Sequence, residues 1–170
     1  IGIFAAIQAT IHADDEVIIF DPSYDSYAPS IKLVGAKPIH IALKHPEFTV
    51  DWNQVKQAIT DKTRMIIVNT PHNPTGAIWS KQDWLHLIEL IQDKNILVLS
   101  DEVYEHLIYD GQQHYSALSF PELRDRSFVV GSFGKTFHVT GWKTGYCIAA
   151  PALMTVFRQV YQFANFCGVT

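Results

Sequence analysis

Short apolar runs separated by amphipathic segments constrain the fold more than any other feature of this chain. Four of the runs cover residues 16–21, 64–69, 95–100 and 127–132. The run at 64–69 is apolar without alternation, which is typical of a parallel strand covered on both faces. Further strands are expected at 37–43 and 145–150. Strands that alternate with helices predict an α/β fold in three layers, α/β/α, with a mostly parallel sheet in the middle.

Helices are expected between these strands wherever apolar residues recur at helical spacing. Asp51 with Gln54 is a capping-box pattern, and Ser80 is a second N-cap. Residues 105–126 have a weak pattern, broken by glycine and proline, and predict an excursion with at most a short helix. The expected helices are one through Thr10, one with the stripe Tyr27, Ile31 and Val34 that Gly35 ends, and one from Asp51. Two more are expected, one from Ser80 with the stripe Trp84, Leu87, Ile88 and Ile91, and one from Pro151 with Val156, Phe157, Val160 and Ala164 facing inward.

Composition limits the classes of function that the chain can serve. With 170 residues of which 48% are hydrophobic, one domain with a sizeable core is expected. The net charge of −4 includes no basic cluster, so neither a nucleic-acid partner nor a membrane surface is indicated. Cys147 and Cys167 are far apart and the eight histidines are scattered, so no metal site is expected. A soluble, cytoplasmic protein that binds a small molecule is predicted. The chain opens at Ile1 inside an expected helix, which indicates a fragment.

The segment 132–150 carries the residues with the most chemical meaning. A run of small residues contains Lys135, and Lys143 follows in a Gly-rich turn. A cofactor with an aldehyde and a phosphate needs an amine for a Schiff base, and a cation, a hydroxyl and backbone N–H groups for the phosphate. Ser132, Lys135 and Lys143 offer these groups. A lysine in such a turn is by itself usually a solvated loop residue.

The pattern Ser-Phe-Gly-Lys, Gly-Trp-Lys and Gly-Tyr in this segment resembles the lysine signature of class I and II aminotransferases. These are enzymes of pyridoxal 5'-phosphate (PLP) fold type I. The resemblance implies that Lys135 carries PLP as a Schiff base, while Ser132 and Lys143 hold its phosphate. Many members of the family have arginine where this chain has Lys143, and either cation can meet a phosphate.

Other chemically distinctive residues also follow predicted strands. Parallel strands bind ligands at their carboxyl ends, so Tyr24, Asn73, Asp101, Tyr104, Ser132 and Lys135 can converge at one edge of the sheet. Each has a simpler interpretation from the residues alone. Asp101 could cap a helix, Asn73 could belong to a Pro/Asn turn, and Tyr24 and Tyr104 could be packed aromatics.

The resemblance assigns these residues roles as well. It covers essentially the whole chain and is clearest in the stretches 21–31, 69–76, 100–107 and 132–147. Asp101 would pair with the protonated pyridine nitrogen of PLP, and Tyr104 and Asn73 would bond its phenolic oxygen. Tyr24 would stack on its ring. The motifs look most like those of the methionine aminotransferases and the kynurenine aminotransferase/glutamine transaminase group.

The function that the resemblance implies is transfer of an amino group between an amino acid of methionine, glutamine or aromatic type and a 2-oxo acid. In that comparison residues 1–170 form the central, incomplete part of the PLP-binding large domain, without the N-terminal arm and the C-terminal small domain. The arginine for the substrate carboxylate would lie outside this chain, and a homodimer is implied. The alternatives are a PLP-dependent C–S or β-lyase and a non-catalytic sensing module of a transcription regulator. The fragment alone could also bind PLP weakly or not at all.

Overall fold

A six-stranded sheet forms the centre of the molecule in the computed structural model, which describes residues 1–165. The strand order is β2-β1-β3-β4-β5-β6; β6 is antiparallel to β5 and the other neighbours are parallel. The expected mostly parallel sheet is therefore confirmed. The strands are β1 (Glu16–Asp21), β2 (Lys37–Ala42), β3 (Thr63–Asn69), β4 (Leu97–Asp101), β5 (Ser127–Ser132) and β6 (Gly145–Ala149).

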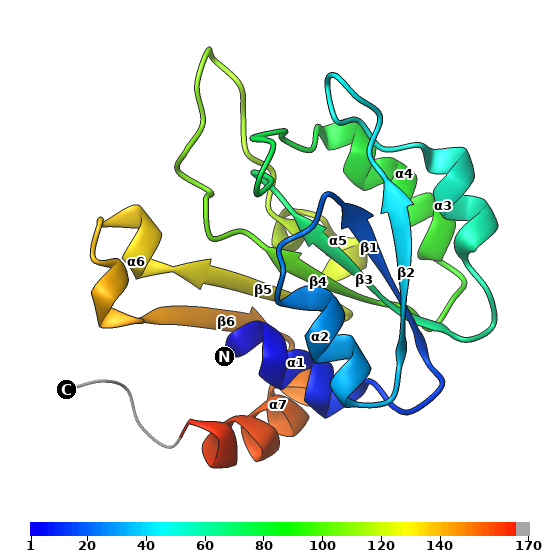
Figure 1. Cartoon of the computed structure of the whole chain (residues 1–170), viewed down its shortest axis with the longest axis vertical. Coiled ribbons are helices and arrows are strands. Elements are labelled where there is room, and N and C mark those ends of the chain that lie inside the picture. The colour runs from blue at the N-terminus through cyan, green and yellow to red at the C-terminus, as the bar shows by residue number, and fades with distance from the viewer. Residues whose placement is uncertain (166–170) are drawn as a thin grey trace.

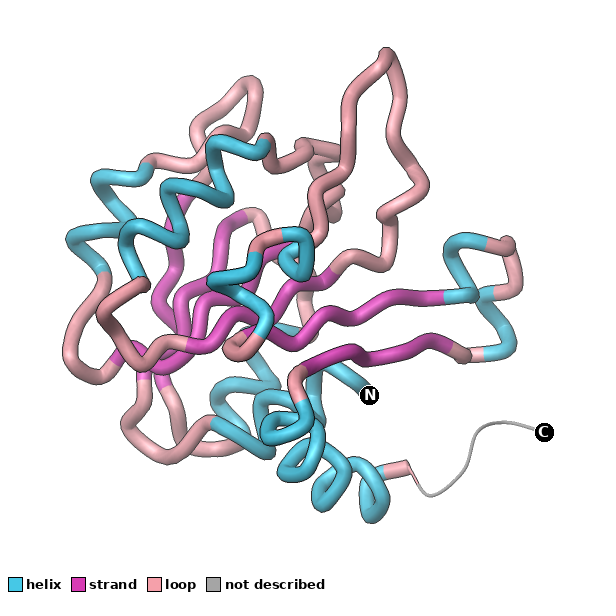
Figure 2. The backbone as a smooth tube through the Cα atoms, turned by 180° about the vertical axis from the view of Figure 1, so that it is seen from behind, coloured by secondary structure: helices cyan, strands magenta, loops and turns pink. Residues whose placement is uncertain are grey.

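Helices cover both faces of the sheet, so the three-layer prediction is also confirmed (Figures 1 and 2). One layer holds α1 (Gly2–Thr10), α2 (Tyr27–Leu33) and α7 (Pro151–Ala164). The other holds α3 (Trp52–Ala58), α4 (Lys81–Ile91), the 3₁₀ turn η1 (Ala117–Ser119) and α5 (Pro121–Arg124). Two short elements, α6 (Phe133–Thr136) and η2 (Thr140–Trp142), form the tip of the β5–β6 hairpin.

Alternate residues of each central strand face opposite cores. In β3, Met65 and Ile67 pack with α1, α2 and α7, whereas Ile66 and Val68 pack with α3 and α4. All four are buried. Successive side chains of a strand point to opposite faces, so a strand covered on both sides must be apolar at every position. This double burial explains the continuous apolar runs of the sequence.

The helix caps differ in one detail from the prediction. Asp51 accepts hydrogen bonds from the backbone N–H groups of Asn53 and Gln54 at 3.1 and 3.2 Å, which caps α3 from one side. The reciprocal capping box is found instead at the start of α4, between Ser80 and Asp83. The aspartate three residues after the serine accepts from the Ser80 backbone N–H at 2.8 Å. A shorter acid can thus replace the usual Glu or Gln of this motif.

The inward stripe of α7 was predicted only in part. Phe157 is buried and Val160 packs against the same core, as expected. Ala164 is exposed and Val156 is not among the side chains packed against this core, so these two assignments were wrong. Leu153, Met154 and Tyr161 occupy the inward positions instead. The helix is therefore rotated from the predicted phase, because its bulkier side chains at 153, 154 and 161 fill the space over β5 and β6.

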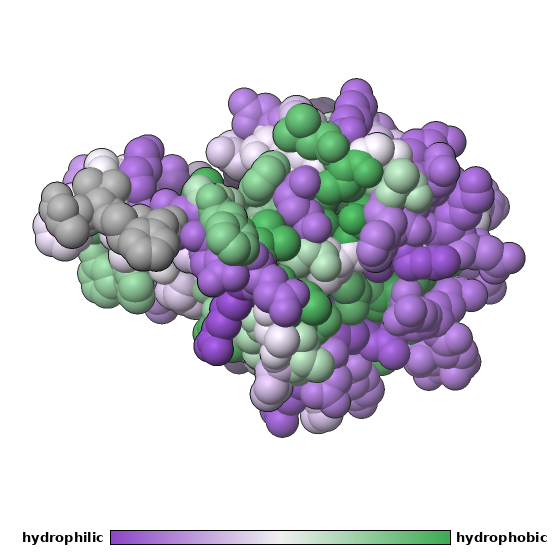
Figure 3. All heavy atoms as spheres, turned by 90° about the horizontal axis from the view of Figure 1, so that it is seen from below, coloured by the Kyte–Doolittle hydropathy of each residue, from purple (hydrophilic) through white to green (hydrophobic). Residues whose placement is uncertain are grey.

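The lower face of the molecule, in the orientation of Figure 1, carries both apolar and polar residues. Apolar side chains gather near the middle of this face, where α1, α2 and α7 lie, with polar side chains around them (Figure 3). Exposed apolar residues in these helices include Leu33 and Phe163. Among residues 1–165, no helix is long and apolar enough to cross a membrane. Cys167 lies outside the described residues.

Removal of a core side chain of α4 should test the packing of the second layer. Leu87 is fully buried, whereas Leu85 in the same helix is 42% exposed. We expect Leu87→Ala to lower the free energy of unfolding by about 2 to 5 kcal/mol, since it leaves a cavity. The matched control Leu85→Ala should change it by roughly 0.5 kcal/mol or less. Urea unfolding of both variants of the whole protein measures this, and equal losses would contradict the assigned layer.

Candidate active site at the carboxyl edge of the sheet

The carboxyl ends of the central strands bring polar side chains to one edge of the sheet. The strand register places Asn69 of β3 beside Asp101 of β4, and Asp101 beside Val130 of β5. Ser132 then ends β5, one residue before α6. The order β2-β1-β3 reverses the winding direction between β1 and β3, and such a switch point is where open α/β sheets bind ligands. The segments after β1, β3, β4 and β5 therefore all begin at this edge of the sheet.

Asp101 is the buried charge of this edge, with a residue exposure of only 3%. Its Oδ2 accepts a hydrogen bond from Tyr27 Oη at 2.6 Å, and Oδ1 accepts a long one from the Val103 N–H at 3.4 Å. None of the ion pairs within residues 1–165 involves this carboxylate. Burial raises the pKa of Asp101 above its ordinary value, neighbouring Glu102 adds to the rise, and the two hydrogen bonds oppose it. A buried carboxylate of this kind is stabilised by a cation.

Asn69 braces the loop after β3 against the end of β4. Its Nδ2 donates to the Asp101 carbonyl at 2.9 Å, and its Oδ1 accepts from the Asn73 N–H at 2.7 Å. The neighbouring Thr70 N–H also donates to the Asp101 carbonyl, at 3.1 Å. Asn73 is therefore fixed through its backbone, while its side chain lines an open cleft. The loop is therefore a Pro/Asn turn, as the simpler interpretation expected, and the same turn places Asn73 beside the cleft.

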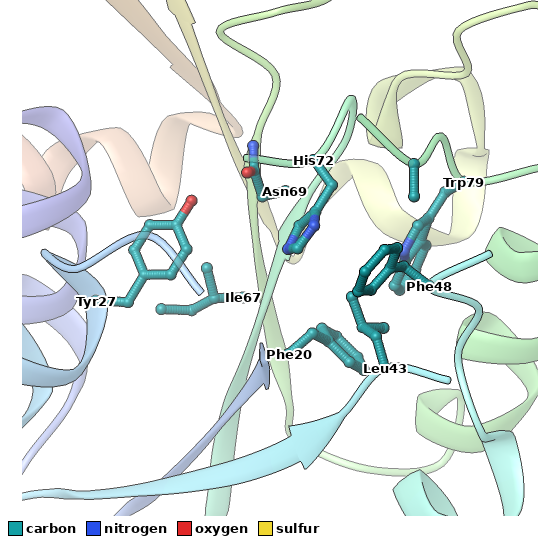
Figure 4. Close-up of a pocket in the computed structure, with 9 residues that line it drawn as sticks. Phe20, Tyr27, Leu43, Phe48, Ile67, Asn69, His72 and Trp79 are labelled. Atoms are coloured by element: carbon teal, nitrogen blue, oxygen red, sulfur yellow. The ribbon is translucent and has the colours of Figure 1, made fainter. Parts of the chain in front are cut away.

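Two hollows adjoin these residues. A small crevice of about 10 Å³ lies at the switch point, between Tyr27, Asn69 and His72, with Phe20 and Trp79 at its base (Figure 4). An open cleft of about 410 Å³ lies between the loop 71–78 and the segment 104–112. Of these two hollows, the cleft has the size of a small-molecule site, and Asn73 and Tyr104 line it.

Lys135 lies at the start of the hairpin tip, after β5. Its Nζ sits over the ring of Tyr104, 5.4 Å from the ring centroid. The residue is exposed, so the amine is open to reagents from solvent. Its backbone N–H donates to Ser132 Oγ at 3.4 Å, which makes Ser132 the cap of α6. The structure thus brings Ser132, Lys135 and Tyr104 together, although they come from two strand ends.

The remaining predicted residues lie farther from these contacts. Tyr24 is 42% exposed in the turn before α2, so it is not a core aromatic; its ring meets that of Tyr27 edge-on at 5.5 Å. Through Tyr27 it is linked to Asp101. Lys143 is exposed at the other end of the hairpin tip, with a left-handed φ of 53°. No ion pair within residues 1–165 engages its side chain.

Two residues with clear roles at this edge were not singled out in the sequence. Tyr27 was assigned to the apolar stripe of a helix, but its buried hydroxyl is the main donor to Asp101. A buried tyrosine needs a partner for its hydroxyl, and that requirement was the available signal. Asn69 was seen only as one of two asparagines in the loop. Cys147 is half-buried, and burial raises the pKa of its thiol to about 12, so it has no reactive thiolate here.

The chain matches known proteins along its whole length. The family described as aminotransferase class I and II matches residues 2–170. Methionine aminotransferase of Escherichia coli is 47% identical over 97% of this chain, and aspartate aminotransferase of Sulfolobus acidocaldarius is 41% identical over 88%. Kynurenine–oxoglutarate transaminase 3 of Rattus norvegicus is 38% identical over 95%.

Solved structures give the same result. A crystal structure from Escherichia coli, of an enzyme identified with a methionine aminotransferase function, has a TM-score of 0.96 and 46% identity. The match covers 98% of this chain and 44% of that one. The chain likewise spans 43%, 38% and 38% of the three relatives above, which is about two fifths of their length. The fold and the family resemblance expected from the sequence are both confirmed.

The raised pKa of Asp101 predicts how stability depends on pH in the protein without added ligand. An acid with a raised folded pKa contributes stability at low pH, and this is lost as pH rises through the folded value. Asp101→Asn keeps an acceptor for Tyr27 and removes that loss. We therefore expect the variant to gain in melting temperature over the wild type as pH rises from 4 to 8. The exposed Asp61→Asn serves as the control. A variant that loses relative stability toward pH 8 would contradict the unpaired buried charge.

Proposed function

This chain belongs to the class I and II aminotransferase family, and on that premise we propose that the whole protein transfers an amino group between an amino acid and a 2-oxo acid with PLP as cofactor. One observation carries the proposal beyond the family match. The buried, uncompensated carboxylate of Asp101 and the open amine of Lys135 lie on the same edge of the sheet. A cofactor with a protonated ring nitrogen and an aldehyde suits both groups.

The environment of Asp101 suits that cofactor. A carboxylate this deeply buried costs free energy unless a cation or several donors meet it, and in this structure it has one strong donor. A pyridinium N–H would provide the missing charge, and Asp101 would in turn keep that nitrogen protonated. When bound in this way, PLP draws electrons from the substrate Cα, which makes the Cα proton acidic. Tyr27 orients the carboxylate for the task.

Lys135 is the residue that we assign to both attachment and proton transfer. Its Nζ would hold the cofactor covalently at rest and would be released when the substrate amine arrives. The free amine would then accept the proton from the substrate Cα and return it as an acid. The ring of Tyr104 lies directly under this nitrogen, 5.4 Å from ring centroid to Nζ. This contact would help to orient the amine toward the bound cofactor.

The other predicted residues would bind and orient the cofactor. Tyr104 and Asn73 would donate to its phenolic oxygen, and both line the open cleft. Ser132 and Lys143 would hold the phosphate, one as a hydroxyl and the other as a point charge. Tyr24, exposed beside Tyr27, would lie against the ring face. These roles follow the family resemblance, position by position.

Substrate class, assembly and location are the finer parts of the proposal. We assign methionine, glutamine or an aromatic amino acid as donor, a 2-oxo acid as acceptor, and a homodimer as the assembly. The methionine and kynurenine enzymes among the relatives support that donor class, while the aspartate enzyme is the competing case. The three relatives named above are aminotransferases or transaminases, so they favour neither alternative function, the PLP-dependent lyase or the sensing module of a transcription regulator. A cytoplasmic location stays a prediction of the sequence.

Attachment of the cofactor to Lys135 is tested by reduction with borohydride. The whole protein loaded with PLP should carry the reduced cofactor on the peptide that contains Lys135, as seen by mass spectrometry. Lys135→Arg should remove the label and lower transamination by at least about 10³-fold, because arginine keeps the charge but offers no nucleophilic amine. The control Lys94→Arg, at an exposed position after α4, should behave like the wild type. Label on another lysine would refute the assignment.

A panel of amino donors tests the substrate class. A second carboxylate on the substrate needs its own cation, since an unpaired buried charge is costly. The matched motifs contain Lys135 and Lys143, and both are assigned to the cofactor. We therefore expect kcat/KM for methionine, glutamine or phenylalanine to exceed that for aspartate by at least about tenfold. Preference for aspartate or glutamate would overturn the substrate class while leaving the family intact.

A further inference from the structure

A tyrosine reaches across one strand of the sheet to hold the loop that carries Tyr104. Tyr146 lies on β6, and its Oη donates to Glu105 Oε1 at 2.5 Å. Glu105 lies in the turn after β4, and β5 separates β4 from β6 in the sheet. The hydroxyl therefore spans a whole strand to meet its partner. Neither residue belongs to the cofactor site proposed above.

Gly131 makes this reach possible. It pairs with Tyr146 in the β5–β6 register, and the tyrosine ring lies over its Cα. A Cβ at position 131 would lie 2.1 Å from Cζ and 2.4 Å from Oη of Tyr146, which no real side chain tolerates. A strand glycine is expected where another group approaches the backbone this closely.

The two ends of the tyrosine contact different parts of the site. Its ring packs against Phe133 with centroids 5.4 Å apart, and Phe133 precedes Lys135 by two residues. Its hydroxyl holds Glu105, which directly follows Tyr104 in the chain. Tyr146 thus connects the segment that carries the amine to the segment that carries the ring under it.

The carboxylate of Glu102 holds together the two ends of the loop that carries Tyr104 and Glu105. Glu102 is 1% exposed; its Oε1 accepts from Ser100 Oγ at 2.8 Å and from the Ala117 N–H at 2.9 Å. Its Oε2 lies 3.0 Å from His114 Nε2. The carboxylate of Glu102 therefore contacts residues at both ends of the loop formed by residues 103–116. Glu102 thus holds the two ends of the loop, and the bond from Tyr146 to Glu105 ties its first turn to β6.

Charge in this cluster favours the tyrosine as a donor. Ligand atoms of Glu102, Glu105 and His114 lie within 4.8 Å of one another, a grouping that the scattered histidines of the sequence did not reveal. Burial first, then the hydrogen bond and charge of Glu105 and the charge of Glu102, raise the pKa of Tyr146 to about 12. The hydroxyl therefore keeps its proton at neutral pH. Because Glu102 and Glu105 already have donors, we assign the cluster no metal.

We propose that Tyr146 and Glu105 are positioning residues, whose hydrogen bond across Gly131 holds Tyr104 against Lys135. The inference rests on the proposed function, because it specifies what controls two of its residues. Loss of the bond should free the turn at 103–106 and loosen the contact of 5.4 Å between the Tyr104 ring and Lys135 Nζ. The sheet and both cores would stay intact, since the bond lies outside them.

Three variants of the whole protein separate this role from a merely structural one. Tyr146→Phe keeps the ring on Gly131 and Phe133 but removes the donor, and Glu105→Leu removes the acceptor. Glu105→Gln retains a side-chain oxygen that can accept the same bond. The matched control is Tyr115→Phe, which removes a hydroxyl bonded at 3.0 Å to exposed Gln113, at the other end of the loop.

Amide hydrogen exchange in the cofactor-free protein is the first readout. Residues 103–112 should exchange roughly tenfold faster in Tyr146→Phe and Glu105→Leu, the effect of one lost hydrogen bond, whereas exchange in β3 and β4 should not change. In the PLP-loaded protein, the pH midpoint of the cofactor absorbance should rise by about half a unit, because Tyr104 no longer stabilises the anionic oxygen as well. We expect kcat to fall about tenfold with little change in KM.

The pattern across variants decides the inference. Glu105→Gln should recover at least half of the wild-type kcat, and the double variant Tyr146→Phe/Glu105→Leu should be no worse than either single one. Normal exchange, midpoint and kcat in Tyr146→Phe would overturn the positioning role, as would equal defects in Tyr115→Phe. If the wild type transaminates and these variants have normal exchange, midpoint and kcat, only the positioning role is refuted. A wild type without Lys135 labelling refutes the proposed function, and the exchange experiment still tests the link.

Discussion

The parallel register of β3, β4 and β5 is the constraint on which the rest of this edge depends. It places Asn69, Asp101 and Val130 side by side, so loops that are far apart in the chain start next to one another at the same edge of the sheet. The middle of each of these strands is apolar on both faces, and polar side chains gather at the carboxyl ends. Polar groups at these ends can be satisfied by loops or by a bound molecule. The double-sided core therefore also determines where chemistry can occur.

Burial at the edge is uneven, and that unevenness has chemical meaning. Asp101 is buried and accepts one short hydrogen bond, whereas Glu102 is buried and both of its carboxylate oxygens have hydrogen-bond partners. Lys135 is open to solvent. Two adjacent acids in one short segment thus have different environments. Within residues 1–165 Asp101 has no ion-pair partner, whereas Glu102 contacts Ser100, Ala117 and His114 at the two ends of a loop. Environment, more than residue type, separates the two roles.

The sequence predicted the elements that depend on local pattern and missed those that depend on distant partners. Apolar runs bounded by polar residues located the strands, and helical periodicity located α4 with Trp84, Leu87 and Ile91 inward. The phase of α7 could not be read correctly, because its apolar residues lie on more than one side of the helix and packing against the core selects among them. At the site, motif residues were identified by resemblance. Tyr27 was not, since its partner Asp101 lies 74 residues away.

Gly131 carries a consequence for how this chain can change by mutation. Its missing side chain and the ring of Tyr146 occupy the same space, so neither position can be judged alone. An alanine at 131 would push the ring of Tyr146 off the backbone, whereas beside a small residue at 146 it would meet no ring. The effects of substitutions at the two sites should therefore be epistatic. A library that varies 131 against a constant tyrosine at 146 would measure this coupling as if it belonged to the glycine alone.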